Sequence, residues 1–365
     1  MAVDCIEDNA ATFVFDSTTL RNQQRVPQQF VWPDEEKALS CFNDLDVPAI
    51  DIGAFLSGDP TASETATTLI GDACRKHGFF LITNHGVDKQ LIADAHKYTE
   101  DFFVLPLGEK QKAQRAVGHH CGYSSSFIGR FSSRLPWKET LSFGYSPQNN
   151  SKLIRDYVEN TMGESYAKFG TLFQRYADEM NRLCMCILEI LAVSLGVRRM
   201  HFKEFYEDND SIFRLNYYPP CISPELTLGT GPHCDPTSLT ILHQDQVGGL
   251  QVFVDGEWRL VRPNADAFVV NIGDTFMALT NGRYKSCLHR AAVNSEAARK
   301  SLTFFLSPNQ ENIVTPPSEL VDHLHPRIYP DFTWAKLLKF TQKHYRADMH
   351  TLETFSKWLE HRRTE

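Results

Sequence analysis

Residues 231–239 read GPHCDPTSL and place a histidine and an aspartate two positions apart, at His233 and Asp235. In a β-strand, residues i and i+2 project from the same face. At the start of a strand, both side chains would therefore face one ion while Cys234 points away. A solvated polar turn can contain the same residues, so the pair needs a third ligand from elsewhere in the chain.

The third ligand that we expect is His289, in the run YKSCLHR. The chain between Asp235 and His289 has room for about four strands with their turns, enough to return to a neighbouring strand of a rolled sheet. Two histidines and one carboxylate form the facial triad of non-haem Fe(II) oxygenases, which leaves coordination positions open. Zinc accepts the same ligand types, so the triad alone does not identify the metal.

A carboxylate anchor follows the third ligand. Arg299 and Ser301 flank Lys300 where a strand is predicted to begin, so they share one face. An arginine fork binds a carboxylate through two hydrogen bonds, and a serine hydroxyl can add a third. Beside an iron with open positions, such an anchor suits a 2-oxoglutarate cosubstrate, with O2 at the last position. Upstream, Tyr217 and Tyr218 face opposite ways, and a buried phenol needs a hydrogen-bond partner.

The composition narrows the classes of partner. The chain has 365 residues and a net charge of -8, which argues against nucleic acid as the main partner, since a basic face is the usual footprint. No stretch approaches the roughly 18 apolar residues of a membrane helix, and the first residues do not form a signal sequence. The cysteines form no CxxC pair, so we expect reduced thiols in the cytosol. Without a heptad pattern, we expect a monomer.

The elements that must position these residues fall into two groups. In the first half, we expect short strands at 48–52 and 77–82, and helices over 63–75, 88–103 and 165–196, the last ending at Gly196. Residues 1–46 look like an extended arm. The segment 108–160 is rich in glycine, serine and aromatic residues, and we expect it to consist mainly of loops.

The second half changes to a strand pattern. We expect short strands at 212–216, 239–243, 250–254, 258–261, 267–272, 288–293 and 302–306. Asp255-Gly256 lies between two of them and is a strong hairpin signal. Residues 334–361 return to a helical period. The fold class is therefore α+β, with a β-barrel or jelly-roll core flanked by helices.

Five motifs carry a resemblance to the plant 2-oxoglutarate and Fe(II)-dependent dioxygenase family: HGFFLITNHG (77–86), NYYPPC (216–221), HCD (233–235), His289 and RKS (299–301). The resemblance implies a double-stranded β-helix core at 206–310, after an N-terminal extension (1–46) and an α-rich region (47–205), and before a C-terminal helical segment (311–365). It implies Fe(II) at His233, Asp235 and His289. It also implies 2-oxoglutarate on Arg299, Ser301, Tyr218 and Asn216, O2 as the second cosubstrate and ascorbate as reductant.

Within the family, the run LPWKET (135–140) resembles the corresponding motif of the gibberellin 20-oxidases. The resemblance implies successive oxidation and removal of carbon-20 of a diterpenoid carboxylic acid, a gibberellin precursor. It also places Trp137, Lys138, Glu139 and Arg134 at the substrate entrance. From the residues themselves, we expect phenylalanine-rich walls around the rings and a basic residue for a carboxylate, drawn from Arg130, Arg134 and Lys138.

Alternative readings remain at this point. Trp137 also fits a core residue, and Lys138-Glu139 also fits a solvated pair. The triplet His119-His120-Cys121 has metal-capable groups but no nearby acid, which favours a surface or packing role. The rival functions are a family member acting on another gibberellin carbon or a flavonoid, a small-molecule binding protein without metal, and a zinc hydrolase. A hydrolase would leave Arg299 and Ser301 without a task.

Overall fold

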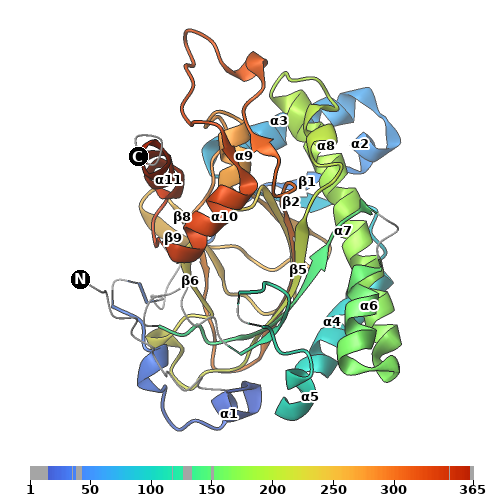
Figure 1. The fold of residues 1–365 in the computed structure, drawn as a ribbon, viewed down its shortest axis with the longest axis vertical. Helices are drawn as coiled ribbons and strands as arrows, with labels where there is room; N and C mark the ends of the chain where they lie inside the picture. The colour runs from blue at the N-terminus through green and yellow to red at the C-terminus, as the bar shows by residue number, and fades with distance from the viewer. Residues whose placement is uncertain are drawn as a thin grey trace, which may run out of the picture.

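The structure is a computed structural model and describes residues 15–34, 36–37, 43–116, 118–125, 134–148, 152–344 and 346–361. Its centre is a pair of β-sheets that face each other, with the helices on the outside (Figure 1). The major sheet has eight strands, in the spatial order β1 (Ala49–Asp51), β2 (Phe79–Thr83), β10 (Phe268–Ile272), β7 (Leu239–Gln244), β12 (Arg299–Leu306), β5 (Ser211–Tyr218), β4 (Glu139–Tyr145) and β3 (Gly122–Ser124). The minor sheet has four, in the order β6 (Thr230–His233), β11 (His289–Ala291), β8 (Leu250–Val254) and β9 (Glu257–Leu260).

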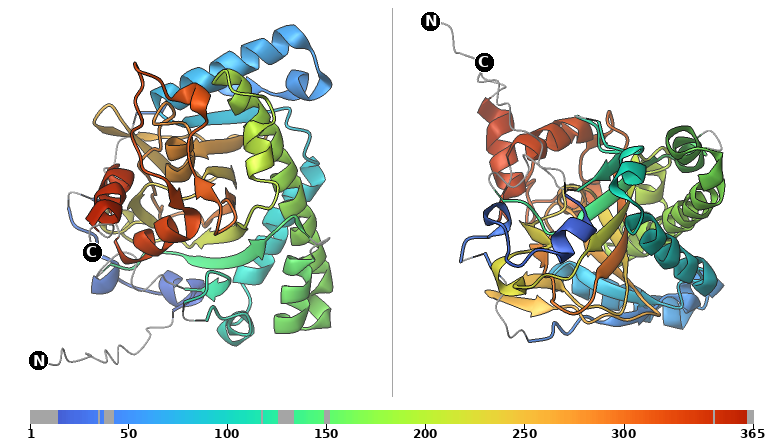
Figure 2. Two further views of the ribbon diagram at one scale, coloured as in Figure 1. Left: turned by 45° about the horizontal axis from the view of Figure 1, so that its top comes forward. Right: turned by 90° about the horizontal axis from the view of Figure 1, so that it is seen from below.

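Helices surround this core, chiefly on the outer face of the major sheet (Figure 2). Those before the jelly roll are α1 (Ser17–Arg21), α2 (Gly53–Ser57), α3 (Pro60–Lys76), α4 (Lys89–Phe103), α5 (Leu107–Gln111), α6 (Leu153–Met162), α7 (Ala167–Ser194) and α8 (His201–Phe205). Later ones are α9 (Asp274–Leu279), α10 (Trp334–Lys343) and α11 (Thr351–His361), and a small third sheet pairs β13 (Ile313–Val314) with β14 (Phe332–Thr333). Short 3-10 turns cover Gln28–Phe30, Glu164–Tyr166, Pro224–Leu226 and Ser318–Leu320.

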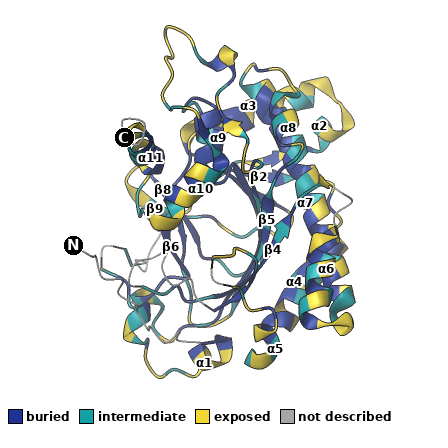
Figure 3. Ribbon diagram, viewed as in Figure 1, coloured by how far each residue is buried: buried dark blue, intermediate teal, exposed yellow. Residues whose placement is uncertain are grey.

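Strand β12 shows why the two faces of the major sheet differ. Leu302, Phe304 and Leu306 alternate along it and join the core cluster that α7 completes. Thr303 and Phe305, which lie between them, face the space between the sheets, because successive side chains of a strand point to opposite faces. The strands are therefore mostly buried, whereas the outer helices have one buried and one exposed side (Figure 3).

The long helix α7 agrees with its predicted range of 165–196. Its apolar residues recur at helical spacing and cover the sheet, and Gly196 follows its end with a φ of +70°. This left-handed backbone conformation is one that glycine adopts without a side-chain clash, so it terminates the helix as expected. The hairpin between β8 and β9 is also confirmed, since Asp255 and Gly256 both have positive φ values, 53° and 80°.

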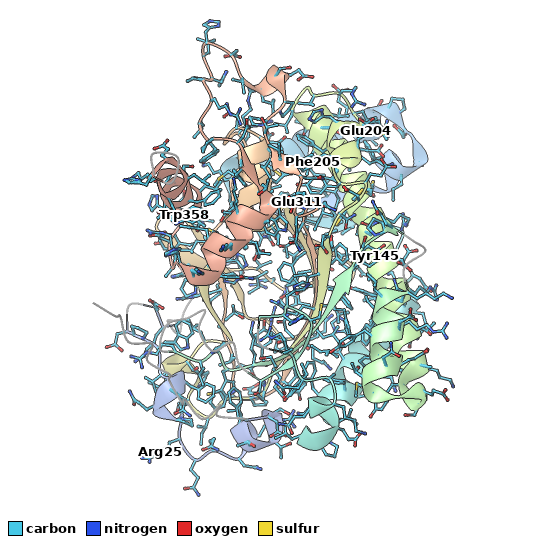
Figure 4. All side chains as sticks on the ribbon, in the orientation of Figure 1. Arg25, Tyr145, Glu204, Phe205, Glu311 and Trp358 are labelled. Atoms are coloured by element: carbon cyan, nitrogen blue, oxygen red, sulfur yellow. The ribbon has the colours of Figure 1, made fainter. Side chains whose placement is uncertain are left out.

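The expectation that 108–160 consists mainly of loops is corrected in part. The described part of this segment contains β3, β4 and α6, and β4 pairs along its whole length with β5. Leu141, Phe143 and Tyr145 alternate with small polar residues, which is a strand pattern with its polar face turned inward. Tyr145, at the end of β4, lies beside α7 (Figure 4).

The remaining predictions differ from the structure in detail. Two strands and two helices of the first half, and seven strands of the second, lie within a few residues of their predicted ranges. The helical period of 334–361 is divided into α10 and α11, and α9 was not expected. No helix of the described residues is long and apolar enough to span a membrane.

Candidate active site

Three predicted ligands meet between the sheets. Donor atoms of His233, Asp235 and His289 all lie within 4.8 Å of one another. His233 Nε2 is 3.5 Å from Asp235 Oδ1, and His289 Nε2 is 3.8 Å from Asp235 Oδ2. Within the described residues, this is the one group of three or more histidine, cysteine or acidic side chains with that geometry.

The backbone selects the tautomer of both histidines. His233 Nδ1 lies 2.8 Å from the carbonyl oxygen of Gly231, and His289 Nδ1 lies 3.1 Å from that of Cys287. A carbonyl oxygen only accepts, so each Nδ1 carries the proton and donates it. The lone pair of each Nε2 then faces the third ligand, which is the arrangement that metal-binding histidines require.

Asp235 is buried and held by two side-chain donors. Thr240 Oγ1 donates to its Oδ2 over 2.6 Å, and Asn271 Nδ2 donates to the same oxygen over 2.9 Å. Burial raises the pKa of Asp235, but the neighbouring His289 and His233 and these hydrogen bonds outweigh it and hold the pKa below its ordinary value. The group is therefore an anionic oxygen donor at neutral pH. Two imidazoles and one carboxylate fit Fe(II) by ligand type.

The backbone that presents Asp235 is a turn, which corrects the expected position of the ligand pair at a strand start. His233 is the last residue of β6, and Asp235 follows in the turn before β7. The turn is held by the start of α9, because the Asp274 amide donates to the Asp235 carbonyl over 2.8 Å. A Cβ at Gly273 would lie 2.0 Å from the carbonyl oxygen of Thr237, so this contact requires glycine.

The predicted anchor residues come together on two paired strands. In the register of β12 and β5, Arg299 is opposite Tyr218 and Ser301 is opposite Asn216. Arg299, Tyr218 and Asn216 line one cavity, and Ser301 contacts Asn216. Asn216 Nδ2 donates to Ser301 Oγ over 3.2 Å, and the guanidinium carbon of Arg299 lies 5.0 Å from the centre of the Tyr218 ring.

Arg299 has donor capacity to spare. It is 1% exposed and gives one bond of 3.1 Å from its terminal nitrogen to Gln244 Oε1, whereas its buried Nε has no hydrogen-bond partner among the described residues. A buried, unpaired guanidinium donor is costly, and a carboxylate ligand would satisfy it. Gly229 leaves room for the Tyr218 ring next to Arg299, since a Cβ at residue 229 would lie only 2.4 Å from that ring.

The cavity encloses about 910 Å³ of empty space, including its opening to solvent. It is lined by the triad and by Arg299, Asn216 and Tyr218 of the anchor. Its other lining residues are Ser124, Lys138, Thr140, Arg214, Thr230, Thr240, Leu242, Leu250, Val269, Asn271, Arg290, Ala291, Thr303 and Phe305.

The LPWKET motif divides between the cavity and the outside. Lys138 lines the cavity, but Trp137 is fully buried against Phe30, and its Nε1 donates to the Pro219 carbonyl over 3.1 Å. Glu139 points the other way and accepts from Lys110 Nζ over 2.8 Å. The structure thus does not bring the four predicted entrance residues together.

The two arginine predictions have separate outcomes. Arg134 is half-buried and is not among the residues that line the cavity. Arg130 lies outside the described residues.

Four further residues belong to the site but were not expected from the sequence: Thr240, Asn271, Gln244 and Arg214. The sequence does place polar residues at alternate positions of strands β7, β10 and β5. These positions can be recognised as site residues only when the inward face of each strand is known.

Family models match two parts of the chain. Residues 209–308 match the 2OG-Fe(II) oxygenase superfamily, and residues 47–164 match the family described as non-haem dioxygenase in morphine synthesis N-terminal. Gibberellin 20 oxidase 3 of Arabidopsis thaliana is 58% identical to the chain over 100% of both proteins. Gibberellin 20 oxidase 1-D of Triticum aestivum is 60% identical over 95% of this chain and 96% of its own.

Solved structures show the same architecture. The crystal structure of JOX2 in complex with 2OG, Fe, and JA has a TM-score of 0.82 and 30% identity, covering 94% of this chain and 98% of its own. The rice dioxygenase for auxin oxidation has a TM-score of 0.70 and 27% identity, covering 84% and 99%. The α+β jelly roll, and an enzyme that uses Fe(II), 2-oxoglutarate and O2, are thereby confirmed. The chain belongs to the 2OG-Fe(II) oxygenase superfamily and, within it, to the gibberellin 20 oxidases.

Proposed function

We propose that the chain oxidises carbon-20 of a gibberellin precursor in successive steps and removes it. We assign His233, Asp235 and His289 as the Fe(II) ligands. The observation that carries this assignment is the triad itself, with both Nε2 lone pairs and an ionised carboxylate directed at one point. Bound together, Fe(II), 2-oxoglutarate and O2 supply an oxidant strong enough to remove hydrogen from an unactivated carbon, with release of succinate and CO2.

We further propose that Arg299 and Ser301 bind the far carboxylate of 2-oxoglutarate, with Tyr218 and Asn216 beside them. The buried Nε of Arg299 supports this role because it has no partner among the described residues. Asn216 orients Ser301 through its hydrogen bond of 3.2 Å. The anchor also argues against a zinc hydrolase, whose chemistry has no need for a second carboxylate site.

The protein's own contribution is alignment. The target carbon must be held within a few ångströms of the metal, and rigid strands achieve this better than loops. The cavity walls supplied by β4, β5, β7, β10 and β12 meet that requirement. From the LPWKET motif, we propose that Lys138 adds positive charge to the wall beside Tyr218, since its Nζ lies 5.8 Å from that ring centre.

The test is product analysis. Purified protein is incubated with Fe(II), 2-oxoglutarate, ascorbate, air and a gibberellin precursor, and products are identified by mass. We expect stepwise oxidation at carbon-20, and its loss in His233→Ala and Arg299→Ala variants. Oxidation at another carbon, or of a flavonoid only, would reject this substrate while retaining the enzyme class. Iron binding with neither succinate nor oxidised product would reject the function.

We propose that the enzyme acts as a monomer in the cytosol, without a nucleic-acid or membrane partner. The net charge of -8 and the absence of a membrane-spanning helix from the described residues support this. Light scattering after size exclusion should give the mass of one chain, 41.6 kDa. A stable dimer at working concentration would contradict the proposal.

A further inference from the structure

We propose that Gln244 orients Arg299 through a neutral contact and so keeps the charge of Arg299 available for the far carboxylate of 2-oxoglutarate. Gln244 is then a positioning residue that decides the preference for a 2-oxo acid with two carboxylates over one with a single carboxylate. The inference rests on the proposed function, because it takes Arg299 as the cosubstrate anchor. Three observations carry it: the contact between the two side chains, their place in the sheet, and the charges around them.

The first observation is the contact itself. A terminal nitrogen of Arg299 donates to Gln244 Oε1 over 3.1 Å, and this is the one hydrogen bond that the Arg299 side chain makes within the described residues. A guanidinium only donates, so the amide oxygen of Gln244 must face it. Arg299 is 1% exposed and Gln244 is 2% exposed, so solvent does not compete for this contact.

The second observation is the place of Gln244 in the major sheet. Gln244 ends β7 and is opposite Ser301 of β12, which is in turn opposite Asn216 of β5. These three residues form one row across the sheet, and Arg299 forms the next row with Tyr218. Gln244 is not among the residues that line the cavity, so it acts on a ligand there through Arg299.

The stem of Arg299 is confined as well. A Cβ at Gly249 would lie 3.1 Å from Arg299 Cδ and 3.4 Å from its Nε, so the backbone just before β8 lies against the stem. The Tyr218 ring centre lies 5.0 Å from the guanidinium carbon. With the stem enclosed, the bond to Gln244 determines how the planar guanidinium is turned. That direction matters because a fork of donors binds a carboxylate in one plane.

The third observation concerns the charges around Arg299, which makes no ion pair with the described residues. Asp245, the acid that follows Gln244 in the chain, accepts instead from the Lys300 amide over 2.7 Å and from the Val247 amide over 3.1 Å. Arg299 is thus oriented by a neutral amide and not by a carboxylate. A carboxylate in place of Gln244 would pair with Arg299 and repel the far carboxylate of the cosubstrate.

The experiment measures dissociation constants by calorimetry, with Mn(II) in place of Fe(II) so that no turnover occurs. Wild type, Gln244→Glu and Gln244→Leu are each titrated with 2-oxoglutarate and with 2-oxobutyrate, which lacks the far carboxylate. We expect both changes to weaken 2-oxoglutarate binding by about 10- to 100-fold, as for loss of a charged hydrogen-bonded contact, with Gln244→Glu the weaker binder. The affinity for 2-oxobutyrate should stay unchanged.

The matched control is Gln251→Glu. Gln251 is also buried, and it accepts over 2.7 Å from Arg290, another arginine that lines the cavity. It contacts the minor sheet and not the anchor, since Arg290 lies on β11 and Gln251 on β8. This variant should bind 2-oxoglutarate as tightly as wild type.

Arg299→Ala separates this inference from the proposed function. If the Gln244 variants bound 2-oxoglutarate as tightly as wild type while Arg299→Ala did not, the inference would be overturned and the anchor would stand. If Arg299→Ala also bound it as tightly as wild type, the anchor would fail, and this inference with it. Equal losses for both 2-oxo acids in the Gln244 variants would place the effect at the metal end, which would also overturn the inference.

Discussion

At the scale of single residues, two side chains support Asp235, one of the three proposed Fe(II) ligands. Thr240 and Asn271 both donate to Oδ2, which restrains the carboxylate and leaves Oδ1 facing His233. Residues that orient a ligand commonly contribute a factor of 10 to 100 to metal affinity. Neither residue was singled out in the sequence, because a threonine and an asparagine on separate strands have no local pattern in common.

We therefore predict that Thr240→Val lowers the affinity for Fe(II) by about 10-fold or more while the protein remains folded. The measurement is an anaerobic Fe(II) titration, with the melting temperature recorded in parallel. Thr303→Val is the matched control. Thr303 lines the same cavity, but its hydroxyl accepts a hydrogen bond from Asn216 and makes none to Asp235. Equal affinities of wild type and Thr240→Val would show that the bond to Asp235 does not support the metal.

At the scale of elements, strand β4 joins the N-terminal arm to the wall of the cavity. Glu139 faces away from the cavity and accepts hydrogen bonds from Lys110, from the Tyr123 hydroxyl and, over 2.8 Å, from the Ser17 amide at the start of α1. Its neighbours Lys138 and Thr140 face the cavity. The LPWKET motif thus contributes both to the cavity wall and to the buried ion pair, because alternate residues of a strand point to opposite faces.

Removing one member of this buried ion pair should be costly. Lys110 and Glu139 have fully buried side chains, so Lys110→Met leaves a buried carboxylate without its cation. We predict a loss of about 3–5 kcal/mol in the free energy of unfolding, measured with denaturant. The control is Lys112→Met, because Lys112 is 47% exposed and pairs with Glu109 on the surface. That change should leave the free energy of unfolding almost unchanged, because an exposed ion pair is screened by water. Similar stabilities for the two variants would contradict the prediction.

At the scale of the whole molecule, several histidines are enclosed in the neutral form. Burial lowers the pKa of His77 and His243, and lowers that of His85 to about 4 and of His96 to about 3. His243 Nε2 donates to the Ala265 carbonyl over 3.2 Å, so its Nδ1 accepts from His96 Nε2 over 2.8 Å. This short chain links α4 to β7, and it needs a neutral His243, because a protonated ring has no acceptor nitrogen.

The pH dependence follows from the direction of these shifts. A histidine with a lowered pKa in the folded state binds protons more readily when unfolded, so stability falls as the pH drops below the unfolded value of about 6.5. We predict that the melting temperature of the metal-free protein falls steadily from about pH 6.5 to about pH 4. His96→Gln should reduce that slope, and the exposed His323→Gln should not. A flat profile across this window would refute the prediction.

Local patterns were sufficient for much of the fold. Strands such as β8 and β12 and the helix α7 carry clear periodicities, and Gly196 and Asp255-Gly256 mark their ends with residues that adopt positive φ. The segment containing β4 carries an alternation of this kind at Leu141, Phe143 and Tyr145, but its glycine- and serine-rich surroundings indicated loops. Its polar face lines a cavity and not solvent, which only the tertiary structure shows.

The sequence by itself determined the chemical inventory: the residues His233, Asp235 and His289, the Arg299–Ser301 pair and the family to which they belong. Such information is local, since it consists of residue types at short spacings. Only the tertiary structure decided which face of each strand those residues share. It turned Glu139 outward and Arg214 inward, and it placed Asp235 on a turn held by α9. Registers between β4, β5, β7 and β12 are set by pairing across long separations, so no single segment encodes them.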